Sequence, residues 1–343
     1  MRRNFRRICR ITVANLLYYF GLFKLRRFFR AVILRQHEVC VLGLHRVLNK
    51  DEHAQANSPG AIILTEETFK KLLEHLSQAY CVVSLEDFLR RRFDQGSWSR
   101  PLCLITFDDG WKDNYTTAFP LLKNFRIPAT VFLATGFIGH RSPVWVERLM
   151  RAFKNEPDRE RIMAEIGGEV QRQRHGCEME DIVEYLKHMS GDNRRQILKR
   201  VIPTGEAIPG PESGDDLLSW DQVMEMQCHG IEFGSHTVTH PLLIYEDDAS
   251  VKRELQVSLE TLQEKLHRQI RGFAYPNGNW DERVRRWVQE IGYECAFTTQ
   301  PGWHRRGQDP YTVKRIMLHE GKVTGGDGKF SAAMFSLTLA RFR

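Results

Sequence analysis

Short apolar runs alternate with longer amphipathic stretches along most of the chain. The apolar runs are typical of buried strands, and they lie at residues 38–47, 81–84, 101–107, 128–134, 231–236, 271–276 and 294–299. The stretches between them carry apolar side chains at helical spacing, most clearly at residues 65–80, 219–230, 248–266 and 281–292. Thr65 and Ser219 stand where a helix N-cap is expected.

This repeated order of strand and helix predicts the fold class. Strand-then-helix units imply a mainly parallel sheet. At least six such strands favour a (β/α) barrel over an open sheet, with the chemistry at the loops that follow the strands. Residues 141–216 break the pattern because they are charged and helical. We interpret them as an insertion into one domain at residues 37–343.

The composition is that of an ordinary soluble globular protein, with 42% hydrophobic and 27% charged residues. The formal net charge of +7 is unevenly placed, since ten Lys and Arg residues and no acidic residue precede Glu38. The rest of the chain is slightly acidic, which argues against a nucleic-acid partner. The seven cysteines are scattered without a Cys-x-x-Cys pair, which indicates reduced thiols and a cytoplasmic protein.

Residues 1–36 form a basic amphipathic segment that we expect to lie on the inner face of a membrane. Its basic clusters flank an apolar stretch that comprises Leu16, Leu17, Tyr18, Tyr19, Phe20, Leu22, Phe23, Leu25, Phe28 and Phe29. No apolar run reaches the ~20 residues needed to cross a bilayer, and the small-residue cleavage site of a signal peptide is missing. Leucine and aromatic bulk beside basic residues is typical of an interfacial helix. A helix that covers the bottom of the barrel is the alternative.

Two adjacent carboxylates, Asp108 and Asp109, follow the apolar run at residues 101–107. An ordinary Asp-Asp-Gly turn is one explanation. Like charges repel, however, so two acids at one strand end make more sense if a cation or a proton separates them. His236 and His240 follow another predicted strand, and their spacing of four would place both rings on one side of a helical turn. Two histidines and a carboxylate at strand ends suit Zn²⁺ or another first-row divalent ion.

The ordered motifs TFDDG, SHTVTHP and FAYPNG resemble those of the NodB-type polysaccharide deacetylases (carbohydrate esterase family 4). The resemblance implies a distorted, incomplete (β/α) barrel. It implies that Asp109, His236 and His240 hold a divalent metal, with Zn²⁺ expected first and Co²⁺ as an alternative. It also implies that Asp108 is the general base, which takes a proton from the attacking water.

The later motifs supply further candidates. The resemblance implies that the YPNG loop contacts the substrate or the oxyanion, with the backbone N–H of Asn277 as the expected oxyanion donor and Tyr275 as a further candidate. The family's late Leu-His pair corresponds to residues 318–319, so His319 is the candidate general acid, with a solvated strand-end histidine as the alternative. His45 in GLHRV resembles a histidine on the first strand of related deacetylases. It is a candidate for substrate contact or for a structural role.

One position departs from the family pattern. Many members have an arginine two residues before the proline of the third motif, where it orients the catalytic aspartate. This chain has Ala274 there. A sub-branch of the family also reads FAYP-x-G, so we interpret the change as variation without loss of activity. What orients Asp108 is then an open question.

The predicted enzyme is a metal-dependent hydrolase of carbon–nitrogen bonds. It would remove N-acetyl groups from amino sugars of a polysaccharide or of a lipid-linked glycan precursor. Hydrolysis of a non-sugar amide on the same scaffold is one alternative. A catalytically inactive glycan-binding relative is another. The intact Asp-Asp and His-x-x-x-His pairs argue against inactivity, whereas Ala274 leaves it open.

Overall fold

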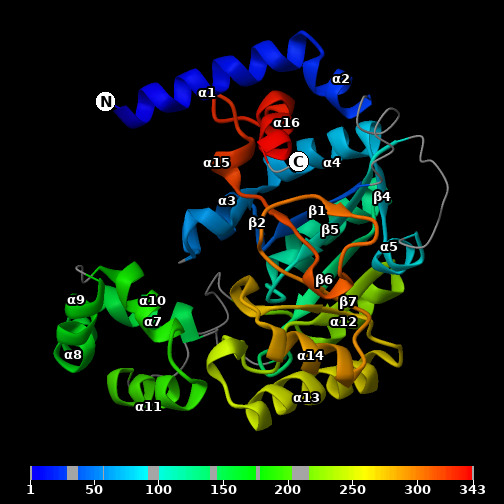
Figure 1. Ribbon diagram of the computed structural model, residues 1–343. Coiled ribbons are helices and arrows are strands. Elements are labelled where there is room, and N and C mark those ends of the chain that lie inside the picture. Colours follow the sequence, from blue (N-terminus) through cyan, green and yellow to red (C-terminus); the bar gives the residue numbers. More distant parts are fainter. Residues whose placement is uncertain are drawn as a thin grey trace.

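The computed structural model describes residues 2–28, 38–56, 58–91, 100–139, 145–174, 178–202 and 216–341. In these ranges the chain forms a curled, mostly parallel sheet with helices around it (Figure 1). The strands of the main sheet run in the order β10-β1-β5-β6-β7-β8-β9, with β11 paired to β1 and β4 paired to β5. Only β1 and β10 pair antiparallel within this sheet as described. A separate parallel pair joins β2 and β3.

The strands are short, and most lie within the apolar runs of the sequence. Their bounds are β1 Glu38–Leu44, β2 Arg46–Leu48, β3 Ile63–Thr65, β4 Cys81–Val83, β5 Leu102–Phe107, β6 Ala129–Leu133, β7 Ile231–Ser235, β8 Gly272–Ala274, β9 Cys295–Phe297, β10 His304–Arg305 and β11 Ile316–Met317. Strands β9 and β1 do not pair with each other in the described sheet. The segment 313–317 fills this gap, because Val313 bonds to Ala296 and Thr298 (2.9 Å each) before β11 pairs with β1. We call this segment the seam.

Helices follow the strands as the sequence predicts. They are α3 Lys50–Gln55, α4 Glu66–Ala79, α5 Leu85–Arg91, α6 Phe119–Phe125, α12 Trp220–Cys228, α13 Asp248–Leu266 and α14 Glu282–Ile291. Both predicted N-caps are confirmed, because Thr65 accepts a hydrogen bond from Thr68 and Ser219 forms a capping box with Gln222. A π-helical turn, Asn114–Ala118, precedes α6.

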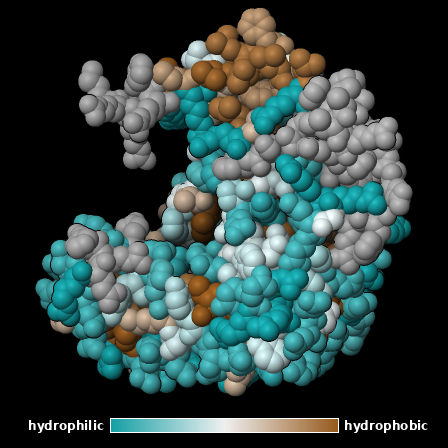
Figure 2. Space-filling view, in the orientation of Figure 1, coloured by the Kyte–Doolittle hydropathy of each residue, from teal (hydrophilic) through white to brown (hydrophobic). Residues whose placement is uncertain are grey.

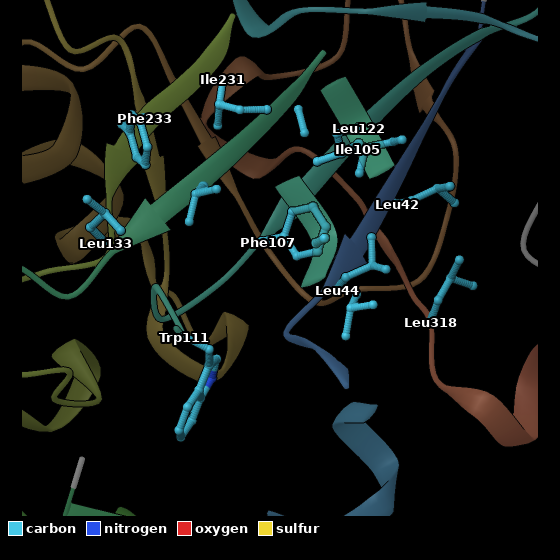
Figure 3. Close-up of a cluster of buried hydrophobic side chains, with 14 of the residues drawn as sticks. Leu42, Leu44, Ile105, Phe107, Trp111, Leu122, Leu133, Ile231, Phe233 and Leu318 are labelled. Atoms are coloured by element: carbon cyan, nitrogen blue, oxygen red, sulfur yellow. The ribbon is translucent and has the colours of Figure 1, made fainter. Parts of the chain in front are cut away.

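Strand β5 is buried on both faces. Cys103, Ile105 and Phe107 join a large cluster between the sheet and the helices, part of which is drawn in Figure 3. Leu102 and Leu104 join a smaller cluster on the other face, which includes side chains of α5. Burial on both faces explains why the strands read as continuous apolar runs. The prediction of a distorted, incomplete (β/α) barrel is confirmed.

Five helices between β6 and β7 pack around a core of their own, at the lower left of Figure 1. They are α7 Trp145–Lys154, α8 Glu156–Ile162, α9 Gly168–Arg174, α10 Met179–Lys187 and α11 Gly191–Val201. The backbone N–H of Gly191 bonds to Glu246, which ties α11 to the loop after β7. The loops at either end of the predicted insertion lie outside the described residues, so its bounds of 141–216 stay a prediction.

The first and last helices lie together at the top of Figure 1. They are α1 Arg2–Tyr19, α2 Leu22–Phe28, α15 Glu320–Val323 and α16 Ala332–Arg341. A small cluster centred on Ala14 and Met334 joins α1 to α16. In the described part of the chain, no helix combines the length and the hydropathy that a membrane crossing requires. Phe29, predicted as part of the apolar segment, lies outside the described residues.

Candidate active site and metal centre

Asp108 and Asp109 lie where β5 ends, at the edge to which the carboxyl ends of the parallel strands point. The amide of Asp108 still bonds to the carbonyl of Leu44 at the end of β1 (3.0 Å). Asp109 and Gly110 then adopt left-handed conformations, with φ of 75° and 83°. A Cβ at Gly110 would approach the side chain of Leu133 to 2.6 Å, so this turn requires glycine. The reversal of the chain gives the two carboxylates different neighbours.

Asp108 is held by a buried arginine from the seam. The two terminal nitrogens of Arg315 donate to Oδ1 and Oδ2 of Asp108 at 2.7 and 2.8 Å. The arginine side chain is 0% exposed, and its Nε donates to the carbonyl of Thr298 (2.9 Å). A two-pronged contact of this kind fixes both the position and the plane of a carboxylate. Arg315 therefore answers the question that Ala274 raised about what orients Asp108.

The same contact sets the charge of Asp108. Burial by itself would raise the pKa of this carboxyl group, but the Arg315 guanidinium and the His236 imidazole lower it by more. The pKa of Asp108 consequently lies well below its ordinary value. Asp108 is ionised at neutral pH and has Arg315 as its permanent counter-charge.

Asp109 faces the two histidines instead. Its Oδ1 lies 3.5 Å from Nε2 of His236 and 3.5 Å from Nε2 of His240. The three ligand atoms all lie within 4.8 Å of one another. One divalent ion could contact all three and keep positions open for water and substrate, which is the arrangement of catalytic metal sites. The structure thus brings together the three residues predicted as metal ligands.

Neighbouring groups orient two of these three side chains. Nδ1 of His236 lies 2.7 Å from the carbonyl of Ala274, so donation by Nδ1–H leaves the Nε2 lone pair directed at Asp109. The indole N–H of Trp111 donates to Oδ2 of Asp109 (3.0 Å) and leaves Oδ1 for an ion. Arg46 stacks on that indole, with its guanidinium carbon 4.3 Å from the ring centroid. This set of outer contacts is what a bound metal ion requires of its protein site.

The prediction of a helical turn between the two histidines is wrong. His236 and His240 follow β7 on a loop in which Thr237 and His240 have positive φ angles of 71° and 56°. The carboxylate of Glu254 on α13 holds the loop by accepting from the amides of Val238 and Thr239, at 2.8 and 2.9 Å. The rings still meet, with centroids 4.8 Å apart. A fixed loop, and not helical spacing, brings them together.

Electrostatics keep the second histidine ready to bind a metal. The pKa of His240 is lowered to about 3, first by burial and then by the nearby His236, against the opposing effect of Asp109. Asp109 shows the reverse balance, since burial would raise its pKa but the imidazoles of His240, His45 and His236 bring it below its ordinary value. A neutral imidazole and an ionised carboxylate are the forms that coordinate metals.

The loop after β8 carries Tyr275 and Asn277. The Tyr275 side chain is fully buried, and its hydroxyl donates to the carbonyl of Tyr311 (3.0 Å). This position argues against direct contact between that side chain and a substrate. Asn277 is exposed and has a positive φ of 56°. Its neighbour Gly278 also has a positive φ. The buried Tyr275 therefore anchors the loop, which places Asn277 at the surface.

His45 and His319 both follow strands at the same edge of the sheet. His45 comes after β1 and lies close enough to Asp108 and Asp109 to lower the pKa of both carboxyl groups. His319 comes after β11 and is half-buried. Its pKa is lowered first by burial and then by Lys322 and Arg10. The structure places His45 beside the carboxylates, whereas His319 is not among the three clustered ligands.

Three residues that sequence reasoning missed support the site: Arg315, Trp111 and Glu254. Arg315 stands 207 residues from Asp108, directly after Lys314 and just before the strand β11. Because a Lys-Arg pair is more often exposed than buried, nothing in the sequence indicated that this arginine is buried. Trp111 follows the Asp-Asp-Gly motif directly, which is a local signal. Glu254 on the predicted helix 248–266 gave no such signal.

The family model, two relatives and a solved structure that resemble this chain are all described as deacetylases. Residues 96–296 match the sequence model of the family described as polysaccharide deacetylase, and this range includes both carboxylates and both histidines of the site. YxkH of Bacillus subtilis (strain 168), a polysaccharide deacetylase by name, is 24% identical over 236 residues, 69% of this chain and 58% of that protein. A poly-β-1,6-N-acetyl-D-glucosamine N-deacetylase of Staphylococcus epidermidis is 34% identical over 77 residues, 22% of this chain and 26% of that protein.

These matches cover little more than half of the first relative and about a quarter of the second. Among solved structures, the deacetylase PplD of Streptococcus pyogenes, in complex with acetate, superposes with a TM-score of 0.55. The superposition covers 83% of this chain and 93% of that chain at 20% identity, so it shows a shared fold. The family match extends over more than half of the residues, and it confirms the resemblance drawn from the motifs. The chain belongs to the polysaccharide deacetylase family.

Proposed function

We propose that this protein is a metal-dependent deacetylase that hydrolyses the N-acetyl group of amino sugars in a glycan. One observation carries the proposal. Three residues that could hold a metal ion, Asp109, His236 and His240, lie beside a separate carboxylate, Asp108. The guanidinium of Arg315 compensates the charge of that carboxylate. A metal-dependent amide hydrolase needs both a site for a divalent ion and a nearby base that does not coordinate the ion.

The ligand set fits a first-row divalent ion, with Zn²⁺ proposed first and Co²⁺ as an alternative. Such an ion, when bound, polarises a carbonyl oxygen and lowers the pKa of water. The protein contributes the orientation of the ligands. The carbonyl of Ala274 fixes His236, the indole of Trp111 fixes Asp109, and the loop of His240 is fixed from α13.

Asp108 has the general-base role in this proposal. Each of its oxygens accepts one hydrogen bond from Arg315 and retains a further lone pair that can take a proton from the attacking water. The backbone N–H of Asn277 is proposed to donate to the developing oxyanion. His319 is proposed as the general acid that protonates the leaving amine. The bidentate contact with Arg315 also removes the reason to regard Ala274 as a sign of an inactive protein.

The proposed substrate class rests on a relative and on the charge of the first helix. The relative from Staphylococcus epidermidis is named for deacetylation of a β-1,6-linked N-acetylglucosamine polymer, which supports an N-acetylhexosamine glycan here. A lipid-linked glycan precursor is our more specific proposal, because the basic first helix suits a protein that works next to a membrane. We place this activity on the cytoplasmic side, since scattered cysteines without a pairing pattern are typical of a reducing compartment.

The test follows acetate release from purified full-length protein together with its metal content. Oligomers of N-acetylglucosamine in β-1,4 and β-1,6 linkage, a lipid-linked N-acetyl sugar and a non-sugar acetamide serve as substrates. We expect acetate from a sugar substrate, loss of that activity after chelation, and recovery with Zn²⁺ or Co²⁺. Acetate release that survives complete removal of metal would contradict the metal dependence. Stoichiometric metal without any acetate would favour a glycan-binding relative, and turnover of the acetamide alone would favour a non-sugar amidase.

A further inference from the structure

Helix α1 has two apolar faces, and only one of them is covered. Ile11, Ala14 and Tyr18 are spaced three and four residues apart, so they share one face, and this face packs against α16. Ala14 is completely buried there. At the same interface Arg7 donates to the carbonyl of Gly325 and Arg10 to the hydroxyl of Thr338, at 3.2 and 3.3 Å. The helix is thus attached to the body of the enzyme by contacts on one side.

The opposite side of the helix is apolar and exposed. Leu16 is 52% exposed, Tyr19 82% and Phe20 75%, and the apolar surface continues onto α2 through Leu25 at 63%. Figure 2 shows hydrophobic residues gathered over the end of α1 and the start of α2, at the top of the view. We call this surface the apolar ridge. It consists of Ile8, Val13, Leu16, Tyr19, Phe20, Leu22 and Leu25.

The apolar ridge is exceptional on this molecule. In the described ranges only three other large hydrophobic side chains are exposed, namely Met224, Tyr245 and Val257, at 37–41%. Those three lie on separate elements, whereas the seven members of the ridge fall within 18 residues of sequence. Contiguous exposed apolar surface of this kind marks an interaction site, because isolated exposed apolar residues are normal and clusters are not.

Charge identifies the partner. Residues 1–37 contain ten Lys and Arg residues and no Asp or Glu. Two copies of this chain that met through the ridge would bring two basic segments together, which opposes self-association. An anionic bilayer offers both complements at once, with negative headgroups for the bases and an acyl boundary for the leucine and aromatic side chains. Tyr and Phe at the ridge suit the depth of the headgroup boundary.

We propose that the apolar ridge binds the surface of an anionic lipid bilayer, with α1 lying in the plane of the membrane and held to the enzyme through α16. This differs from a flexible anchor, because the docked face fixes the enzyme relative to the membrane. Helix α15, next to the docked helix, begins directly after His319 at the strand-end edge that carries the candidate site. Membrane binding would therefore hold that edge at a set position above the headgroups.

The test is co-sedimentation of the full-length chain with vesicles of phosphatidylcholine alone or mixed equally with phosphatidylglycerol. We expect binding to the anionic vesicles at low salt and release as salt increases. Neutralising one base should weaken binding about fivefold. Tyr19→Ser/Phe20→Ser should weaken binding at least about tenfold, since each side chain would lose its burial in the acyl boundary. The matched control, Met224→Ser/Val257→Ser, removes two exposed apolar side chains elsewhere and should bind like the wild type.

Further readouts separate the membrane proposal from its rivals. Tyr19→Ser/Phe20→Ser should keep wild-type acetate release from soluble oligomers, because both side chains point away from the body of the enzyme. Asp109→Ala should bind vesicles normally, so failure of the catalytic proposal would leave this one standing. Absence of binding at low salt, or equal loss in the control variant, would overturn the proposal. A concentration-dependent dimer that Tyr19→Ser/Phe20→Ser abolishes, without vesicle binding, would instead make the ridge an interface between copies.

Discussion

Replacing Arg315 with methionine tests whether this arginine orients the catalytic carboxylate. Methionine preserves much of the length of the side chain but removes its charge, so buried Asp108 loses hydrogen bonds of 2.7 and 2.8 Å. Removing one partner of a buried ion pair costs ~3–5 kcal/mol in the free energy of unfolding. We expect a loss of about 4 kcal/mol on that basis. A displaced catalytic group costs on the order of 100-fold in rate, so kcat/KM should fall by about that factor.

The pH dependence should change as well. In the folded protein burial acts to raise the pKa of Asp108, but Arg315 and His236 hold it below the ordinary value. Asp108 therefore stabilises the fold at pH values above its unfolded pKa of ~4, and this contribution is lost as the pH falls through the folded pKa. Without Arg315, burial raises the pKa, and the acid limb of the kcat/KM profile should move to higher pH. The stability difference between variant and wild type should shrink as the pH falls from the raised pKa of Asp108 in the variant towards its lowered pKa in the wild type, because protonated Asp108 needs no counter-charge.

The assay measures kcat/KM for acetate release against pH, with denaturant unfolding and metal content on the same preparations. Arg285→Met is the matched control, because it removes another two-pronged arginine contact, to Asp309, that is partly exposed. It should cost ~1 kcal/mol or less and leave the acid limb in place. Arg315→Lys keeps the positive charge but cannot make the two-pronged contact. It serves as the test variant if Arg315→Met does not fold. An unchanged rate and acid limb in either folded Arg315 variant would refute the orienting role.

The remaining predictions concern the metal ligands, their support and the proton transfers. Asp109→Ala or His236→Ala should abolish both stoichiometric metal and acetate release, because each removes one of three protein ligands; full metal occupancy in both variants would contradict the site. Asp108→Asn should keep its metal but lose ~10²–10⁴ in turnover, since an amide cannot accept the proton. Wild-type turnover would assign the base elsewhere. Trp111→Phe should weaken metal binding ~10–100-fold in chelator competition, and unchanged affinity would show that the indole does not orient the ligand. His319→Gln should lower kcat and remove the basic limb of its pH profile, and a retained limb would point to another acid.

The elements that sequence predicted well are those whose signals are local. Helix α13 has the predicted bounds of 248–266. Its side chains repeat at helical spacing, and Asp247 caps its first turn. The strands were predicted from apolar runs for the same reason, since burial on both faces leaves a continuous pattern. Local periodicity and caps determine such elements before any tertiary contact is considered.

The candidate site was only partly accessible from sequence because two of its determinants are tertiary. A spacing of four suggested a helical turn for His236 and His240, yet a carboxylate from α13 holds them on a loop with positive φ angles. Spacing alone does not distinguish these geometries. Arg315 could not be assigned to Asp108, because the contact exists only when the seam closes the gap between β9 and β1.

The seam also explains how two adjacent carboxylates can share one strand end. Equivalent acids so close together would repel, and one of them would take up a proton at neutral pH. Here the reversal at Asp109 sends the two side chains to different partners. Arg315 compensates the charge of Asp108 from within the fold, so a bound ion would need to compensate only that of Asp109. A divalent ion held by one carboxylate and two neutral imidazoles retains net positive charge, which is what polarisation of an amide carbonyl requires.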